Sequence, residues 1–353
     1  MRASARALDR ATVNHLSEFS QVIDVRTPSE YALDHVPGAI NCPVLRDDER
    51  AHVGTLYKQE SSFKAKKVGA ALVARNIATH LETAFQDKPR DWQPLVYCWR
   101  GGKRSGAMTH ILREVGWDAQ QLDGGYKAYR RHIVEEIPLL AQGLRLRVVC
   151  GLTGSGKSRL LQALAAIGEQ VLDLEGLAAH KGSVLGSDPL TAQPTQKMFE
   201  SRIWNALRQF DCTRAVYVES ESKKVGNLRV PEALIQAMWE SECLWIETSL
   251  EQRVALLKQE YEHFIADPDA LAEKLMCLRS LHGNETIEHW CAQAKAGNFD
   301  SLVAQLLERH YDPAYTKSIH AHYARLPSAT RAAITSTTVA DFERLASNLR
   351  ERT

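Results

Sequence analysis

Residues 151–158 read Gly-Leu-Thr-Gly-Ser-Gly-Lys-Ser, the pattern of a phosphate-binding loop. Glycines let successive backbone N–H groups point at phosphate oxygens, and the following helix adds its positive N-terminal end. Lys157 supplies a charge for the outer phosphate, and the Ser158 hydroxyl can bind magnesium. The pattern does not distinguish a nucleotide from another diphosphate. The predicted phosphate-binding residues are Gly151, Thr153, Gly154, Ser155, Gly156, Lys157 and Ser158.

A second loop, at residues 98–104, reads Cys-Trp-Arg-Gly-Gly-Lys-Arg and follows a short apolar run. Its three cations, its backbone amides and the start of the next helix all favour the anionic form of the Cys98 thiol. We therefore predict a lowered pKa for Cys98 and a nucleophilic thiolate near neutral pH. The candidate catalytic residues are Cys98, Arg100, Lys103 and Arg104.

The cysteine loop also satisfies the pattern Cys-x5-Arg, which is typical of phosphatases, because Arg104 stands six positions after Cys98. A phosphatase also needs a general acid, normally an aspartate on a mobile loop. Asp118 and Asp123 are candidates, and the sequence singles out neither. The phosphatase alternative therefore stays open at this point.

A polar cluster follows the apolar run at residues 215–218. Glu219 and Glu221 stand where Walker-type ATPases place a carboxylate that helps to hold a metal ion. Lys223 and Lys224 add positive charge at the same edge. A solvated loop of mixed charge is the alternative, but a position at the carboxyl end of a strand favours a metal or phosphate site.

The elements that must position these residues alternate between strand and helix. Apolar runs predict strands at residues 22–26, 95–98, 144–150 and 215–218. Helical spacing predicts helices at residues 103–115, 126–142 and 159–167, and a mostly helical stretch from about 250 to 350. The alternation predicts an α/β layer fold with a parallel sheet behind the phosphate loop.

Length and composition predict two ordered domains. The 353 residues exceed what one core usually organises, and 44% hydrophobic residues supply material for two cores. A net charge of +1 confines any RNA site to a local patch. Seven cysteines without a Cys-x-x-Cys pair argue against a disulfide framework and a zinc site. Without a secretory signal or a membrane-length apolar run, we expect a soluble, cytoplasmic protein.

Residues 10–138 resemble a rhodanese domain. The matching blocks are Asp-Val-Arg-Thr-Pro at 24–28 with Glu30, His-Val-Pro-Gly-Ala-Ile-Asn at 35–41, the Cys98 loop, and Asp-Gly-Gly-Tyr-Lys-Ala at 123–128. In rhodaneses the loop cysteine carries a transferable sulfur as a persulfide. The resemblance implies a rhodanese-like fold for this domain, and the 126–142 helix would link it to the second half of the chain.

The whole chain resembles a narrower family, the bacterial tRNA 2-selenouridine synthases, in which a rhodanese domain is fused to a phosphate-loop domain. Six blocks in the same order carry this resemblance, at residues 48–58, 97–105, 151–158, 173–183, 218–226 and 311–315. It implies a rhodanese-like domain over 10–138 and a P-loop NTPase-like parallel-sheet domain, with a helical C-terminal part, over 139–353.

The resemblance also implies a reaction. This family converts 2-thiouridine at the tRNA wobble position to 2-selenouridine through an S-geranyl intermediate, using geranyl diphosphate and then selenophosphate. By this resemblance the loop at 151–158 would grip the diphosphate of the prenyl donor and not hydrolyse ATP. Cys98 would carry selenium as a selenylsulfide-type intermediate or only orient selenophosphate. No tightly bound cofactor is implied, magnesium is a candidate, and the enzyme that makes selenophosphate is a candidate partner.

Thiolated tRNA, the implied substrate, should be held chiefly by its phosphates. Basic candidates for these contacts are residues 64–67 and 130–132, with Arg145 and Arg147. Trp99 is suited to stacking on a splayed-out base or a prenyl chain, and equally to packing over its own loop. Tyr311 and Tyr315 are candidates for a substrate wall, with a helix-ending turn as the alternative.

Three other functions remain as alternatives. One is an ATP-dependent rhodanese-type sulfurtransferase acting on tRNA, and another is a Cys-x5-Arg phosphatase fused to a kinase-like domain. Both predict ATP turnover or phosphate release. The third is a regulatory module with an inert rhodanese half and a nucleotide switch, which the cations around Cys98 disfavour.

Overall fold

The computed structural model describes residues 11–183, 185–186 and 191–350. The chain divides into two compact units, one formed by Met1–Glu136 with Thr195–Asn205 and the other by Ile137–Pro194 with Ala206–Thr353. Residues 1–10, on which the expectation of no secretory signal rests, lie outside the described part. Within that part, no helix is long and apolar enough to cross a membrane.

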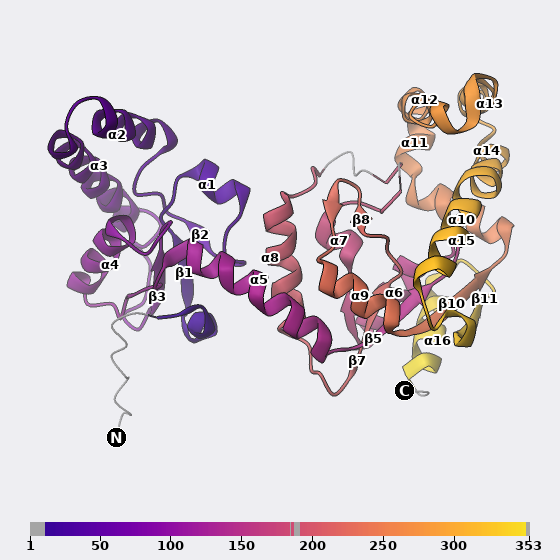
Figure 1. Ribbon diagram of the computed structural model, residues 1–353, viewed down its shortest axis with the longest axis horizontal. Coiled ribbons are helices and arrows are strands. Elements are labelled where there is room, and N and C mark those ends of the chain that lie inside the picture. The colour runs from indigo at the N-terminus through magenta and orange to yellow at the C-terminus, as the bar shows by residue number, and fades with distance from the viewer. Residues whose placement is uncertain (1–10, 184, 187–190, 351–353) are drawn as a thin grey trace. The chain divides into compact units, whose positions relative to one another are not determined.

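The first unit is built on a four-stranded parallel sheet (Figure 1). Its strands, in the order β2-β1-β3-β4, are β1 (Gln21–Asp24), β2 (Ile40–Asn41), β3 (Pro94–Tyr97) and β4 (Gln120–Gln121). Its helices are a 3-10 helix (Val13–Glu18), α1 (Pro28–Leu33), α2 (Asp47–Gln59), α3 (Ser62–Glu82), α4 (Lys103–Val115) and most of α5 (Gly125–Gly143). The strands predicted at 22–26 and 95–98 and the helix predicted from 103 are confirmed.

A buried ion pair follows β1. Arg26 donates to the Asp24 carboxylate at 2.6 Å and to the Asp34 carbonyl at 2.6 Å, and both side chains of the pair are almost fully buried. The Arg26 guanidinium also lies 4.0 Å from the centre of the Tyr126 ring. A buried charge is tolerated only when it is paired. The ion pair therefore gives Asp24 and Arg26, the charged residues of the Asp-Val-Arg block, a structural role.

The first unit includes a segment that returns from far along the chain. Residues 195–205 belong to it, and they form most of α8 (Gln196–Leu207). The Ser201 hydroxyl donates to Asp34 at 2.7 Å, and the Tyr126 hydroxyl donates to the other oxygen of the same carboxylate at 2.7 Å. Trp204 is 1% exposed and packs edge-on against Tyr129. The first domain predicted from the sequence, residues 10–138, does not include this later segment.

The second unit contains a five-stranded sheet in which every neighbouring pair is parallel. In the order β11-β10-β5-β7-β6, its strands are β5 (Arg145–Cys150), β6 (Gln170–Leu172), β7 (Ala215–Glu219), β10 (Glu242–Thr248) and β11 (Thr330–Ile334). A short antiparallel hairpin pairs β8 (Lys224–Val225) with β9 (Leu228–Arg229). The predicted strands at 144–150 and 215–218 and the parallel sheet are confirmed.

Helices surround this sheet and continue beyond it (Figure 1). The helices near the sheet are α6 (Lys157–Ala166), α7 (Leu174–Ala178), α9 (Glu232–Glu240), α10 (Leu250–Glu260) and α16 (Val339–Arg350). The others are α11 (Glu262–Ala266), α12 (Pro268–Met276), α13 (Arg279–Lys295), α14 (Phe299–Leu306), a π-helical turn (Leu307–Tyr311), α15 (Asp312–His322) and a 3-10 turn (Leu326–Ser328). Helices α11 to α14 share a core that includes Leu275, Trp290 and Leu302, all fully buried. The mostly helical prediction for 250–350 is confirmed, with β11 as an edge strand inside it.

Candidate phosphate and cysteine sites

The phosphate loop joins the end of the central strand β5 to helix α6. Strands β7 and β10 lie on either side of β5, so the loop sits where the strand order reverses, which is the usual ligand position in a parallel sheet. Gly156 has a φ of 85°, and a Cβ atom there would lie 2.7 Å from the Phe342 ring. The glycine is therefore required both by the backbone conformation and by the helix α16 packed behind it.

Lys157 lies inside this loop and faces carboxylates. Its Nζ donates to the Gly151 carbonyl at 2.8 Å and stands 5.2 Å from the centre of the Tyr315 ring. Burial lowers the pKa of Lys157, and the nearby charges of Glu175 and Glu221 oppose that shift. A buried ammonium surrounded in this way favours an anionic ligand that brings additional negative charge.

Glu219 and Glu221, the acidic pair predicted at this edge, are joined by Glu175, which the sequence did not single out. The Ser158 hydroxyl donates to Glu175 at 3.1 Å, and the Glu175 amide donates to Glu219 Oε1 at 2.8 Å. Glu219 Oε2 is buried without a hydrogen-bond partner, and burial raises the pKa of Glu219 well above its usual range. Burial, reinforced by the Glu175 charge, raises the pKa of Glu221 to about 8.

The Glu221→Gln variant tests this acidic cluster. In the native protein the pKa of Glu221 is about 8, whereas its ordinary value is 4.5. Between pH 4.5 and pH 8 the carboxyl group is therefore protonated in the native state and ionised in the unfolded state, so unfolding releases a proton. The free energy of unfolding should therefore fall as pH rises from about 4.5 to about 8. Glutamine stays neutral, so the variant should exceed the wild type by at least about 1 kcal/mol near pH 8.5 and by less near pH 5. Urea unfolding at both pH values measures this, and an equal difference at both would contradict the raised pKa.

The two lysines predicted at this edge lie apart from the cavity. Lys223 is exposed, pairs with Glu232 at 3.3 Å and lies over the Trp239 ring. Lys224 is an exposed residue of β8. Neither lines the described cavity at the phosphate loop.

Tyr315 and Tyr311 both face the loop region. The Gly151 amide donates to the Tyr315 hydroxyl at 3.2 Å, and the Ser220 and Tyr315 hydroxyl oxygens are 2.6 Å apart. Tyr315 therefore forms a wall of the polar cavity beside the phosphate loop, and Tyr311 lines the same cavity. This placement agrees with a substrate wall, and Pro313 lies within the first turn of α15.

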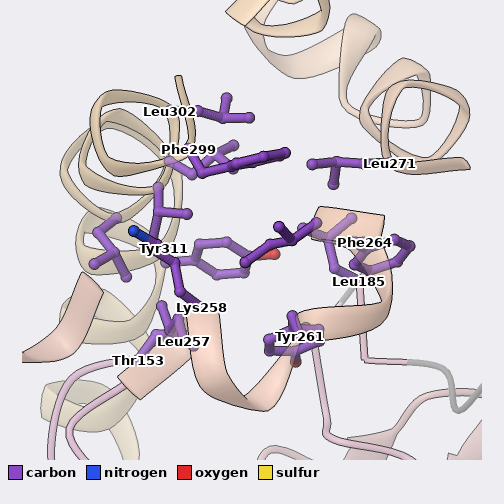
Figure 2. Close-up of a pocket in the computed structure, with 15 residues that line it drawn as sticks. Thr153, Leu185, Leu257, Lys258, Tyr261, Phe264, Leu271, Phe299, Leu302 and Tyr311 are labelled. Carbon is purple, nitrogen blue, oxygen red and sulfur yellow. The ribbon is translucent and has the colours of Figure 1, made fainter. Parts of the chain in front are cut away.

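A second cavity, lined mostly by apolar side chains (Figure 2), adjoins the polar one. The two cavities share Thr153, Ser183, Leu257, Tyr261 and Tyr311. The second cavity is otherwise lined by Leu185, Lys258, Phe264, Ile265, Leu271, Phe299, Leu302, Val303, Leu306 and Leu307. A ligand with a phosphorylated head and a hydrocarbon tail matches this pair of cavities. The sequence did not predict the apolar one, because its walls come from separate helices.

Arg253 fixes the outer part of the phosphate loop. Its side chain is 5% exposed and forms a two-pronged ion pair with Asp312, with contacts of 2.5 and 3.0 Å. The same guanidinium donates to the Thr153 carbonyl at 2.8 Å. The pair thus connects α10, α15 and the loop. It gives a structural role to Asp312, which lies between Tyr311 and Tyr315 in the sequence. Sequence reasoning missed Arg253, whose partner lies 59 residues away.

The Cys98 loop follows β3 in the first unit. The Gly102 amide donates to Cys98 Sγ at 3.3 Å, and the Ser105 hydroxyl donates to the same atom at 3.1 Å. Burial raises the pKa of Cys98, but hydrogen bonds from Ser105, Gly102 and the Arg100 amide together hold it below its ordinary value. The lowered pKa is confirmed. Gly125 supports the loop, because a Cβ atom there would lie 2.3 Å from the Cys98 carbonyl oxygen.

The three predicted cations lie around the loop in different ways. Arg104 donates to Glu30 at 2.9 Å, and Arg50 approaches the same carboxylate at 3.4 Å. Arg100 and Lys103 have exposed side chains. The hydrogen bonds to the sulfur, and not these side-chain charges, account for the lowered pKa of Cys98. Trp99 is 37% exposed and stacks on Tyr126 with ring centres 5.3 Å apart, so it both covers the loop and presents a face to solvent.

The Ser105→Ala variant tests the source of the lowered pKa. Removing a hydrogen bond to the thiolate should raise the pKa of Cys98 and slow its alkylation near pH 7 by about tenfold. The measurement is the pH dependence of carbamidomethylation, followed by mass spectrometry of the Cys98 peptide. Thr109→Val is the matched control, because the buried Thr109 hydroxyl on the same helix has no hydrogen-bond partner. Equal effects of both substitutions would refute the role of Ser105.

The basic stretches predicted to contact RNA are partly engaged within the protein. Lys64 pairs with Glu60 on the protein surface. Arg130 pairs with Glu200, and Arg147 approaches Glu242 at 3.4 Å. Arg145 donates to the Thr213 carbonyl. Residues 64–67 and 130–132 belong to the first unit, whereas Arg145 and Arg147 belong to the second. Within the described residues, no group of three His, Cys, Asp or Glu side chains is arranged to hold a metal ion.

Comparisons with known proteins match both units. A family model described as the tRNA 2-selenouridine synthase AAA domain matches residues 144–277, and the rhodanese-like domain model matches residues 9–132. A tRNA 2-selenouridine synthase of Nitrosomonas europaea is 35% identical over 74% of this chain and 68% of its own length. A tRNA 2-selenouridine synthase of Marinobacter nauticus is 35% identical over 68% of this chain and 65% of its own length. The one in Alcanivorax borkumensis is 33% identical over 86% of this chain and 91% of the relative.

Proposed function

The chain belongs to the tRNA 2-selenouridine synthase family, and from this premise we propose that it replaces the sulfur of 2-thiouridine in tRNA with selenium. The proposed substrates are a tRNA carrying 2-thiouridine at the wobble position, geranyl diphosphate and selenophosphate. The reaction has two steps, alkylation of the sulfur and its displacement by selenium. Each step is assigned to one of the two anion-binding loops.

The adjoining cavities of the second unit are the observation that carries the alkylation step. The diphosphate would lie in the loop at 151–158 against Lys157, and the geranyl chain would occupy the apolar cavity that begins at Thr153 and Leu257. Burial of a hydrocarbon chain favours this ligand over a nucleotide, whose ribose and base need polar partners. The Ser158 hydroxyl, together with diphosphate oxygens, would hold a magnesium ion, which would neutralise charge on the leaving group.

In the alkylation step the thiocarbonyl sulfur attacks C1 of the geranyl group. The C1–O bond breaks, diphosphate leaves with both bonding electrons, and the N3 proton of the base is released. The product is S-geranyl-2-thiouridine. Lys157 and the loop amides would stabilise the charge that develops on the departing diphosphate, and stabilisation of this kind is usually the largest single contribution to catalysis.

In the second step the selenium of selenophosphate attacks C2 of the base. The C2–S bond breaks, geranyl thiol leaves, and water cleaves the P–Se bond to give phosphate and 2-selenouridine. The Cys98 loop is assigned to this step, because the amides and the Ser105 hydroxyl that stabilise anionic sulfur also suit anionic selenium. In this step Cys98 would orient selenophosphate for the attack on C2.

Incubation of the protein with thiolated tRNA, geranyl diphosphate and selenophosphate tests the function. Mass spectrometry of the digested nucleosides should detect 2-selenouridine, and adding ATP should not increase it. An ATP-dependent sulfurtransferase or a fused phosphatase predicts ATP turnover or phosphate release without tRNA. Selenouridine formation that required ATP hydrolysis would contradict the proposal.

A further inference from the structure

Three apolar side chains line the end of the apolar cavity that lies away from the phosphate loop. Figure 2 shows Leu271, Phe299 and Leu302 on the opposite side of the cavity from Thr153 and Leu257. Leu271 belongs to α12, and Phe299 and Leu302 belong to α14. Leu271 is 6% exposed and Leu302 is fully buried. A tail that enters beside the phosphate loop therefore meets these side chains at the far end.

A packed core lies behind this far wall. Leu271 and Leu302 belong to the same apolar cluster as Leu275, Trp290 and Ala294, which are fully buried, and Phe299 packs against that cluster. Because protein interiors are close-packed, the wall cannot retreat to admit additional atoms without disturbing this core. The packed helical group therefore limits the depth of the cavity on this side.

Three of the polar side chains that line the cavity have partners within the protein. Lys258 pairs through its ammonium group with Asp300 at 2.8 Å, so its aliphatic stem is the part available to a ligand. The Tyr261 hydroxyl lies 3.4 Å from the Ser183 hydroxyl. Apart from the Tyr311 hydroxyl, the side chains toward the far end are hydrocarbon, which suits an isoprenoid tail.

We propose that Leu271 and Phe299 set the maximum length of the prenyl chain that this protein accepts. The inference rests on the proposed function, in which the diphosphate is held at Lys157 and the tail extends into the apolar cavity. With the head fixed at one end and a wall at the other, each isoprene unit of five carbons changes whether the tail fits. The two side chains therefore determine how many isoprene units fit into the cavity.

Two substitutions at one position test the inference in opposite directions. The affinities of the full chain for dimethylallyl, geranyl and farnesyl diphosphate are measured by titration calorimetry, with thermal unfolding as a check on folding. Leu271→Ala should shift the ratio of farnesyl to geranyl affinity by about tenfold or more toward the longer chain. Leu271→Phe should shift the preference toward dimethylallyl diphosphate. Leu281→Ala is the control, because Leu281 lies on α13, is 68% exposed and does not line the cavity.

The outcomes separate this inference from the proposed function. If geranyl diphosphate binds but neither substitution changes the preference for chain length, the inference is overturned, whereas the proposal that geranyl diphosphate is the prenyl donor remains supported. If the wild-type protein binds none of the three diphosphates, both are overturned. Where Leu271→Ala fails to fold, Leu271→Phe, which fills space instead of emptying it, decides the question.

Discussion

Replacing Cys98 with serine is expected to abolish selenium incorporation while leaving geranylation of the tRNA intact. The Cys98 thiolate is held by the Gly102 amide and the Ser105 hydroxyl, and a serine hydroxyl stays protonated near neutral pH. We expect the rate of 2-selenouridine formation to fall by about 10²-fold or more, because the loop loses the group that orients selenophosphate for its attack on C2. Mass spectrometry of nucleosides should then show S-geranyl-2-thiouridine accumulating.

Cys42→Ser is the matched control for this experiment. Cys42 lies in the same core cluster, is 2% exposed and has its pKa raised to about 12 by burial, so it is not a nucleophile at neutral pH. The control should retain both steps. Equal loss of geranylation and selenation in Cys98→Ser would count against separate roles for the two loops.

Replacing Lys157 with alanine is expected to remove geranylation. Its ammonium group is the cation that points into the phosphate loop, beside the acidic side chains of Glu175 and Glu221. Without it, a bound diphosphate would lie beside these side chains without the Lys157 ammonium to balance its charge. We expect kcat/KM for geranyl diphosphate to fall by about 10²- to 10³-fold, with weaker binding in titration calorimetry.

Lys223→Ala is the control for Lys157. Lys223 is exposed and paired with Glu232, and it does not line the cavity. It should leave the affinity for geranyl diphosphate unchanged, and Lys157→Ala should still convert tRNA that was geranylated beforehand. An unchanged affinity in Lys157→Ala would place the prenyl donor elsewhere on the protein.

The sequence predicted the elements that hold the two loops because their signals are local. The apolar runs before residues 98 and 151 and the helices after them are encoded by neighbouring residues, and Gly116 ends α4 in a left-handed conformation as its position predicts. Both anion-binding loops have sequence patterns that follow from backbone geometry. The alternation of strand and helix also predicted the parallel sheets.

Features that depend on distant contacts were not predicted. Glu175 reaches Ser158 and Glu219 only because β6 and β7 are neighbours in the sheet. Arg253 and Asp312 are joined across α10 and α15. The helix after residue 195 contributes Ser201 to a carboxylate of the first unit, which no local pattern indicates. The lowered pKa of Cys98 was predicted from the cations, the loop amides and the helix start, whereas in the structure hydrogen bonds from the Ser105 side chain and the loop amides lower it.

The most direct test of the central claim is an order-of-addition experiment on thiolated tRNA with the wild-type protein. Geranyl diphosphate alone should yield S-geranyl-2-thiouridine, and selenophosphate added afterwards should convert it to 2-selenouridine with release of geranyl thiol. Selenophosphate alone should leave 2-thiouridine unchanged. The formation of 2-selenouridine without any prenyl diphosphate would contradict the account, because sulfur would then be displaced without alkylation.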